Sequence, residues 1–329
     1  MRLPPVDYQA PETLDQALAI LNERGPAAAI LAGGTDLVVR LRQRLVTADT
    51  MVSLKNISEL KAIRQEGATL IIGAGASLRE VIDHPVVQQE LPALASALES
   101  VGSPDIQHRQ GTIGGNLLCN TRCIFYNQSG WWRSGLEHCF KNGGQVCHCL
   151  PDSKECTSGC QSDGAVMLTA LSAQASIKSS KGERTVPVGQ IFSGKGEAPF
   201  TLAADELVTD IRIFLPPPGS GMSYQKLRWR SAVDYPLMSA AAVVTFSKDN
   251  VDRVRLVLGT AGPAPLVIDE AEKILRGKPP TPELIGQAAS AARRKAEGLI
   301  VENTIAPADY RRKMAEVLAR RVLTEAVGR

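Results

Sequence analysis

The chain has 329 residues, 37 Lys and Arg against 34 Asp and Glu, and a formal net charge of +3. A charge this small argues against a nucleic-acid-binding protein, and an aromatic content of 4% leaves few rings for stacking bases. The N-terminal sequence lacks a secretory signal, and no apolar stretch reaches the ~18 residues of a membrane span. We therefore expect a cytoplasmic globular protein, long enough for two domains.

In chain order, short helices and strands alternate. The first half is expected to contain a helix at 11–22 with Thr13 as N-cap and Gly25 at its end, a strand at 27–31, a helix at 37–45, a strand at 69–72, and helices at 78–82 and 91–100. The second half is expected to contain a helix at 165–171, strands at 175–179, 206–214, 240–246 and 254–259, and helices at 282–298 and 307–327. The Pro- and Gly-rich run at 216–221 predicts a boundary near 218. The order predicts an α+β protein.

Three glycine-rich turns punctuate the first half, at residues 33–36, 73–77 and 111–116. Successive glycines allow backbone N–H groups to point into one concavity, which suits phosphate oxygens. A plain tight turn is the alternative for each of them. Neither GxGxxG nor GxxxxGK[ST] occurs, so the sequence gives no support to a Rossmann site or a P-loop.

The seven cysteines all lie between residues 119 and 160. Thiols of a cytoplasmic protein stay reduced, so a cluster of them favours metal binding over disulfides. The widely spaced members have no CxxC pair of the kind found in zinc knuckles, and an iron–sulfur cluster needs no fixed short spacing. Spacing alone leaves a cluster and a zinc site open. His138 and His148 are less favoured ligands because the cysteines suffice.

The three turns, read as ILAGGTDLVV, IIGAGASLREV and GTIGGNL, resemble the FAD domain of the molybdenum hydroxylase family, which includes xanthine dehydrogenase and the carbon monoxide dehydrogenase flavoprotein. Residues 202–216 and 224–232 match as well, so the resemblance covers nearly the whole chain. It implies a two-part FAD-binding domain of the PCMH/vanillyl-alcohol-oxidase type over 1–217. It also implies a C-terminal α+β domain over 218–329, as in carbon monoxide dehydrogenase flavoproteins.

The resemblance assigns a set of residues to FAD, which we expect to be bound non-covalently. The turn at 31–36 would wrap the pyrophosphate, and Asp163 would hold sugar hydroxyls. Leu207 and Val208 would lie against the isoalloxazine ring, with Lys226 near its polar edge. Taken alone, Lys226 could be a surface lysine and Asp163 a helix N-cap. The full set is Leu31, Ala32, Gly33, Gly34, Thr35, Asp36, Gly111, Thr112, Gly114, Gly115, Asp163, Leu207, Val208 and Lys226.

The cysteine segment departs from most of the family, because about forty residues are inserted at about 117–161. The run RCIFYNQSGWWR and the cysteines after it resemble the β subunits of 4-hydroxybenzoyl-CoA reductases, a branch of the family that carries a 4Fe–4S cluster. This resemblance implies that the cluster ligands are Cys123, Cys139, Cys147 and Cys156. Cys119, Cys149 and Cys160 would then be non-ligands. We expect Trp131 and Trp132 to pack over the inserted loop.

The implied function is electron transfer, with no catalytic residue on this chain. Its partners would be a large molybdopterin subunit and a small subunit with two 2Fe–2S clusters, in a dimer of heterotrimers, with ferredoxin as electron donor. The implied reaction is reductive dehydroxylation of 4-hydroxybenzoyl-CoA to benzoyl-CoA in anaerobic aromatic degradation. The alternatives are a conventional molybdenum hydroxylase FAD subunit with a structural zinc insertion, or a docking module. The basic run at 311–313 and 320–321 is expected to be a solvated helix face or a partner contact.

Overall fold

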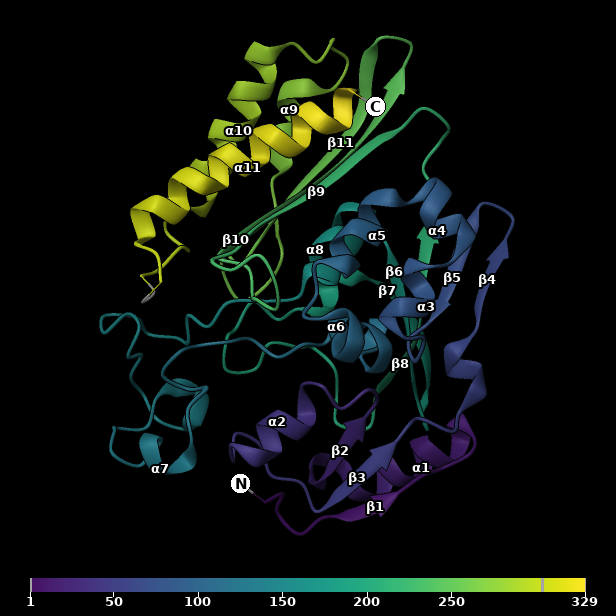
Figure 1. Ribbon diagram of the computed structural model, residues 1–329, viewed down its shortest axis with the longest axis vertical. Coiled ribbons are helices and arrows are strands. Elements are labelled where there is room, and N and C mark those ends of the chain that lie inside the picture. The colour runs from purple at the N-terminus through teal and green to yellow at the C-terminus, as the bar shows by residue number, and fades with distance from the viewer. Residues whose placement is uncertain (1, 303–304, 329) are drawn as a thin grey trace.

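The computed structural model describes residues 2–302 and 305–328 (Figure 1). Its N-terminal part is a parallel sheet of order β1-β3-β2. The strands and helices of this part are β1 (Asp7–Gln9), α1 (Leu14–Arg24), β2 (Ala28–Leu31), α2 (Leu37–Arg42) and β3 (Thr50–Ser53). Thr13 caps α1 by accepting a hydrogen bond from the N–H of Gln16, and Gly25 is the C-cap, as predicted.

The middle part is an antiparallel sheet of order β4-β5-β8-β6-β7 with helices packed against it. Its strands are β4 (Ile63–Glu66), β5 (Thr69–Gly73), β6 (Gln174–Ser179), β7 (Gly182–Pro187) and β8 (Leu207–Phe214). Its helices are α3 (Leu78–Ile82), α4 (Pro85–Glu90), α5 (Pro92–Glu99), α6 (Ile113–Leu117) and α8 (Asp163–Ala170). Because β5 pairs with β8, the start of β8 lies beside the second glycine-rich turn, where the N–H of Ala74 donates to the carbonyl of Thr209 at 2.9 Å.

The C-terminal part is an antiparallel sheet of order β12-β11-β10-β9, with helices over one face (Figure 1). Ala240, Ala242 and Val244 of β10 belong to the core under these helices, whereas Ala241 and Val243 belong to the core of the middle part. Because successive side chains of a strand point to opposite faces, β10 contributes side chains to both cores. The elements are β9 (Gly221–Leu227), β10 (Met238–Ser247), β11 (Asn250–Gly259), β12 (Leu266–Val267), α9 (Asp269–Leu275), α10 (Pro282–Ala296) and α11 (Ala308–Gly328).

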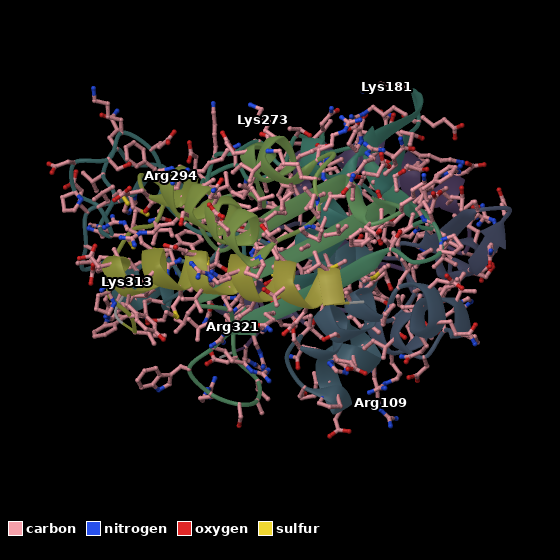
Figure 2. All side chains as sticks on the ribbon, turned by 90° about the horizontal axis from the view of Figure 1, so that it is seen from above. Arg109, Lys181, Lys273, Arg294, Lys313 and Arg321 are labelled. Carbon is pink, nitrogen blue, oxygen red and sulfur yellow. The ribbon has the colours of Figure 1, made fainter. Side chains whose placement is uncertain are left out.

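The prediction of a solvated basic face on α11 is wrong for Arg311. Its side chain is buried, and its guanidinium donates to the carbonyl oxygens of Leu237 at 3.0 Å, Thr260 at 2.7 Å and Val301 at 2.8 Å. Burial lowers the pKa of Arg311 to about 10. The prediction does hold for Lys313 and Arg321 of the same helix, which are exposed. Figure 2 shows that labelled cations are spread over separate parts of the molecule: Arg109, Lys181, Lys273, Arg294, Lys313 and Arg321.

The cysteine segment forms a loop with a short α-helix, α7 (Gly130–Arg133), beside the end of α2 (Figure 1), and with a 3-10 turn at Phe140–Asn142. The hydroxyl of Tyr126 donates to the carbonyl of Leu45 at 2.7 Å, and Arg133 donates to the carbonyl of Arg44 at 2.8 Å. Trp132 contacts Phe125, with ring centroids 6.4 Å apart. Trp131 is 86% exposed, so the expectation that it packs over the loop is wrong: its side chain on this short helix points into solvent.

Among residues 2–302 and 305–328, no helix is both long enough and apolar enough to cross a membrane. The run Pro216–Pro218 lies between the last strand of the middle sheet and the first strand of the C-terminal sheet. A proline there suits a connection because it has no N–H to donate to a sheet.

Candidate functional site

A cavity of about 470 Å³ lies where the N-terminal turn, the third glycine-rich turn, the start of β8 and the connection after β9 meet. All of the residues predicted to bind FAD line it, except Leu31. Leu31 packs instead against the small core of Leu41, Ala48 and Met51. The structure therefore brings together segments that lie far apart in the sequence, from Ala32 to Lys226.

Glycines allow two of the turns to touch. A Cβ atom at Gly33 would lie 1.7 Å from the carbonyl oxygen of Gln110, so a side chain would push the first and third turns apart. Gly34 has φ +74°, a left-handed conformation that L-residues with side chains rarely adopt. At Gly114, a Cβ would lie 2.7 Å from the side chain of Ala74 in the second turn. Close backbone approach is thus a requirement of this cavity wall.

The third turn and the start of α8 are held by side-chain hydrogen bonds. Thr112 is the N-cap of α6 and accepts from the N–H of Gly115 at 3.0 Å. The side-chain oxygen of Asn116 accepts from the N–H of Gly164 and from the hydroxyl of Ser162, both at 3.1 Å. The N-cap of α8 is Ser162, so the alternative role of Asp163 as N-cap is wrong. Asp163 lines the cavity, and its carboxylate is available for other partners.

Asp163 forms a buried polar pair with Lys226. The ammonium of Lys226 lies 2.8 Å from the carboxylate, and each side chain is only 4% exposed. Lys226 also donates to the carbonyl of Ser100 at 2.9 Å, and the hydroxyl of Tyr224 donates to Asp163. Burial raises the pKa of Asp163, and the nearby ammonium opposes that effect. Lys226 is therefore a buried member of the cavity wall and no surface lysine.

The first turn carries an acidic side chain with two basic neighbours. Asp36 lies 3.7 Å from Arg40 on the next turn of α2, and it pairs with Arg122 of the insertion. Arg40 lines the cavity, and burial lowers its pKa. Sequence reasoning missed Arg40, although its spacing of four residues from Asp36 is that of a helical ion pair. Further lining residues that it missed are Gln107, Asn116, Gln161 and Tyr235.

A second, small cavity lies inside the insertion. The four predicted cluster ligands, Cys123, Cys139, Cys147 and Cys156, all line it, together with the aromatic ring of Phe125 and the side chains of Lys141 and His148. Of the other thiols, Cys119 lies in the wall of the large cavity and Cys160 belongs to the core of the middle part. The sulfur of Cys149 lies 3.4 Å from that of Cys123.

The thiols differ in acidity according to their surroundings. The hydrogen bond with Cys149 lowers the pKa of Cys123 to about 6, and the ammonium of Lys141 adds to this effect. Burial raises the pKa of Cys119 to about 12 and that of Cys160 to about 11. Metal ligation requires thiolates. Burial also raises the pKa of Cys156, so these shifts alone do not separate the predicted ligands from the other thiols.

The arrangement of these thiols bears on which metal group would fit. Within the described part of the chain, no three His, Cys, Asp or Glu side chains converge closely enough to hold one metal ion. The four cysteines instead surround a space. A 4Fe–4S cluster takes one thiolate on each of its irons, so its ligands stand around a volume rather than a point. Four thiols match the number of ligands that such a cluster takes, but the cavity that they line measures only about 20 Å³.

Comparisons with known families support the flavin site. The family profile described as the FAD binding domain in molybdopterin dehydrogenase matches residues 4–217, and that of the CO dehydrogenase flavoprotein C-terminal domain matches residues 222–326. The carbon monoxide dehydrogenase medium chain of Hydrogenophaga pseudoflava is 28% identical over 99% of this chain and 98% of its own length. The nicotinate dehydrogenase FAD-subunit of Eubacterium barkeri is 29% identical over 84% and 81%.

Solved structures of related enzymes have the same fold as this chain. Carbon monoxide dehydrogenase from Hydrogenophaga pseudoflava superposes with a TM-score of 0.80 at 28% identity, covering 100% of this chain and 99% of the other. Quinoline 2-oxidoreductase from Pseudomonas putida 86 gives a TM-score of 0.78 at 25% identity, covering 100% and 99%. The predicted α+β fold is confirmed, and so is the predicted FAD. These matches give no support to a 4Fe–4S cluster or to 4-hydroxybenzoyl-CoA as substrate.

Proposed function

This chain belongs to the FAD-binding subunits of the molybdenum hydroxylase family, and on that premise we propose that it passes electrons between its flavin and redox centres on partner subunits. The observation that carries the proposal is the cavity of about 470 Å³, walled by glycine-rich turns and by the Asp163–Lys226 pair. Bound FAD would supply electron transfer in one- or two-electron steps, and the protein would supply binding and orientation.

The residues of the cavity wall would have different roles in holding FAD, according to their chemistry. The backbone of the turn from Gly33 to Asp36 would hold the diphosphate, with the guanidinium of Arg40 as the nearby cation. Leu207 and Val208 are buried at the start of β8 and offer an apolar face to a flat ring. The Asp163–Lys226 pair offers both a hydrogen-bond acceptor and a donor beside that face.

The partners we propose are a large molybdopterin subunit that converts the substrate and a small subunit with two 2Fe–2S clusters. Stopped-flow mixing of the assembled complex with its substrate or electron donor tests the role of this chain. The FAD absorbance should change at a rate at least equal to turnover. A flavin that changes oxidation state more slowly than turnover would rule out this electron-transfer role.

We propose in addition that the insertion holds a 4Fe–4S cluster on Cys123, Cys139, Cys147 and Cys156. The supporting observation is that these four side chains line one cavity, while Cys119 and Cys160 lie elsewhere. Lys141, which donates to the carbonyl of Gly196 at 2.5 Å, adds a positive charge beside the thiolates. A structural zinc ion is the competing occupant.

Serine variants test this ligand set. Replacing any one of the four proposed ligands by Ser should lower iron and acid-labile sulfide, because a hydroxyl is a poor substitute for a thiolate on iron. Cys119→Ser and Cys160→Ser are matched controls from the same segment and should keep both. The measurement is iron, sulfide and zinc analysis of anaerobically purified protein with its absorption spectrum. Stoichiometric zinc without sulfide would exclude the cluster.

We further propose which reaction the complex catalyses, and a conventional hydroxylation is its rival. With a cluster as entry point for electrons, the complex would catalyse 4-hydroxybenzoyl-CoA + 2 e⁻ + 2 H⁺ → benzoyl-CoA + H₂O, with reduced ferredoxin as the source of electrons. The resemblance of the insertion to the β subunits of 4-hydroxybenzoyl-CoA reductases favours this reaction. The rival is a conventional hydroxylase that adds oxygen from water to its substrate and delivers two electrons to an acceptor. The relatives favour the rival, since they include a caffeine dehydrogenase subunit and a xanthine dehydrogenase FAD-binding subunit.

An anaerobic assay of the assembled complex separates the two reactions. Formation of benzoyl-CoA from 4-hydroxybenzoyl-CoA, at the expense of reduced ferredoxin, is the expected result. Hydroxylation of an aromatic heterocycle with an added electron acceptor, without benzoyl-CoA formation, would support the conventional hydroxylase. Both assays use one preparation with measured FAD and molybdenum, so that a missing cofactor is not mistaken for a missing activity.

A further inference from the structure

The carboxylate of Asp36 sits in the turn that walls the flavin cavity, where a negative charge opposes binding of a diphosphate. Its two oxygens face different arginines. One lies 3.7 Å from the guanidinium of Arg40, and the other pairs with Arg122. The side chains of Asp36 and Arg122 are 24% and 15% exposed, so water screens their interaction only in part.

Arg122 comes from the insertion and is fixed there from several sides. It is the residue before Cys123, and its backbone N–H and carbonyl both bond to Gly159, at 3.0 and 3.2 Å. Its guanidinium lies over the ring of Tyr235, 5.3 Å from the centroid, and Tyr235 lines the flavin cavity. The insertion, the first turn and the connection after β9 therefore meet at this one guanidinium.

The charges of Asp36, Arg40 and Arg122 determine the net charge beside the first turn. Asp36 and Arg40 alone would sum to zero, and Arg40 would be drawn to the carboxylate. With Arg122 present the three sum to +1, and the second guanidinium takes over part of the neutralisation. Arg40 lines the cavity, whereas Arg122 reaches Asp36 from the insertion. The cation inside the cavity is thus left available for a bound anion.

We propose that Arg122 is a positioning residue for flavin binding: it shares in neutralising Asp36, so that Arg40, 3.7 Å from the same carboxylate, can also meet the FAD diphosphate. The insertion would then support the flavin site as well as carrying thiols. This inference rests on the proposed flavin role of the cavity and needs no cluster in the insertion.

A double-mutant cycle on the full chain tests the inference, with the dissociation constant of FAD measured by flavin fluorescence. Arg122→Gln should weaken FAD binding about tenfold, the size of a partly screened charge interaction. Arg122→Lys keeps the charge and should restore most of the affinity. In an Asp36→Asn background, Arg122→Gln should cost much less, because no carboxylate remains to be neutralised.

Three results would overturn the inference. They are parental affinity in Arg122→Gln, an equal loss in Arg122→Lys, or an undiminished loss in the Asp36→Asn background. Thermal unfolding of each variant separates loss of fold from loss of affinity. If Arg122→Gln folds poorly, Arg122→Lys and the Asp36→Asn, Arg122→Gln double variant still decide, since both should bind FAD. A parent chain that binds no FAD would instead overturn the flavin role itself, and this inference with it.

Discussion

The two adjacent glycines of the first turn are required for different reasons. Gly33 is required by space, since the carbonyl of Gln110 occupies the position of its missing Cβ. Gly34 is required by conformation, since its φ is +74°. A Cβ at Gly34 would face the side chains of Leu31 and Val38, at 3.2 and 3.3 Å. A side chain there would therefore displace the turn by strain and crowding together.

Gly34→Val should abolish FAD binding in a chain that still folds, because a β-branched residue strongly resists a left-handed backbone. The measurement is the FAD content of the purified protein, with circular dichroism as the check on folding. Gly286→Ala is the control: Gly286 lies within α10 with no atom near the position of a Cβ. It should keep its flavin and gain about 0.5–1 kcal/mol of stability. Normal flavin content in Gly34→Val would show that the turn is merely structural.

His108 gives the middle part a dependence on pH. It is buried, its Nε2 donates to the carbonyl of Val101 at 2.8 Å, and Arg79 donates to its Nδ1 at 3.4 Å. Burial lowers the pKa of His108 below 6.5, and the charge of Arg79 adds to this. The unfolded chain therefore binds the proton first, so stability should fall as pH drops below about 6.5. Thermal unfolding from pH 7.5 to 5 measures the fall, and His108→Gln should make it shallower. An unchanged slope would assign the fall to other groups.

At the scale of elements, Arg311 fastens α11 to the segments around it. Its three carbonyl partners lie before β10, just after β11 and in the segment after α10. Arg311→Met should destabilise the fold by about 3 kcal/mol, because the buried carbonyls lose their donors. Urea unfolding measures the loss. Arg321→Met on the same helix is the control and should change stability little, since Arg321 is exposed. Equal small effects would mean that water replaces the guanidinium.

Elements that a local sequence pattern marks could be predicted, whereas elements that depend on tertiary contacts could not. The helix α1 was predicted because an N-cap and an apolar period mark it in the sequence. The strand β4, read IRQE, is mostly exposed at the edge of its sheet and has no apolar alternation to detect. The strands β1 and β3 were missed because they are three and four residues long and need each other and β2 as partners.

For the candidate site too, local motifs could be predicted from the sequence and long-range contacts could not. Its glycine-rich turns are local motifs that could be read from the sequence, and residues of all three turns line one cavity. The pairing of Asp36 with Arg122 spans 86 residues and depends on where the insertion folds back, which no local pattern encodes. Burial of Lys226 likewise follows from the pairing of β9 with β10 and the carboxylate that α8 presents. Partners brought together by tertiary structure were the part that sequence reasoning could not supply.

At the scale of the whole molecule, the insertion begins and ends at the flavin cavity. Cys119, at the start of the insertion, and Gln161, at its end, both line the flavin cavity, while four thiols between them line the small one: Cys123, Cys139, Cys147 and Cys156. The loop thus leaves and returns at the wall of the flavin site. Its own contacts with the rest of the chain include hydrogen bonds to backbone carbonyls after α2, which water can replace.

This geometry predicts that the thiol-bearing loop can be removed without loss of the flavin. The backbones of Arg122 and Gly159 are hydrogen-bonded to each other in both directions, so the ends of the loop already lie side by side. Replacing Cys123 to Cys156 by a short Gly/Ser linker should cost little in loop closure, which varies only slowly with length. Arg122 and the wall residues of the flavin cavity all remain in such a variant.

The deletion variant should therefore bind FAD but lose its reduction by ferredoxin, if the loop is where electrons enter. The measurement is stopped-flow reduction of FAD by reduced ferredoxin in parent and variant, each assembled with the partner subunits. Reduction by dithionite, a small reductant that needs no docking site, is the control and should proceed in both. Equal rates with ferredoxin would place the loop off the electron path, even if iron is found there. Loss of FAD from the variant would show instead that the insertion supports the flavin site through more than Arg122.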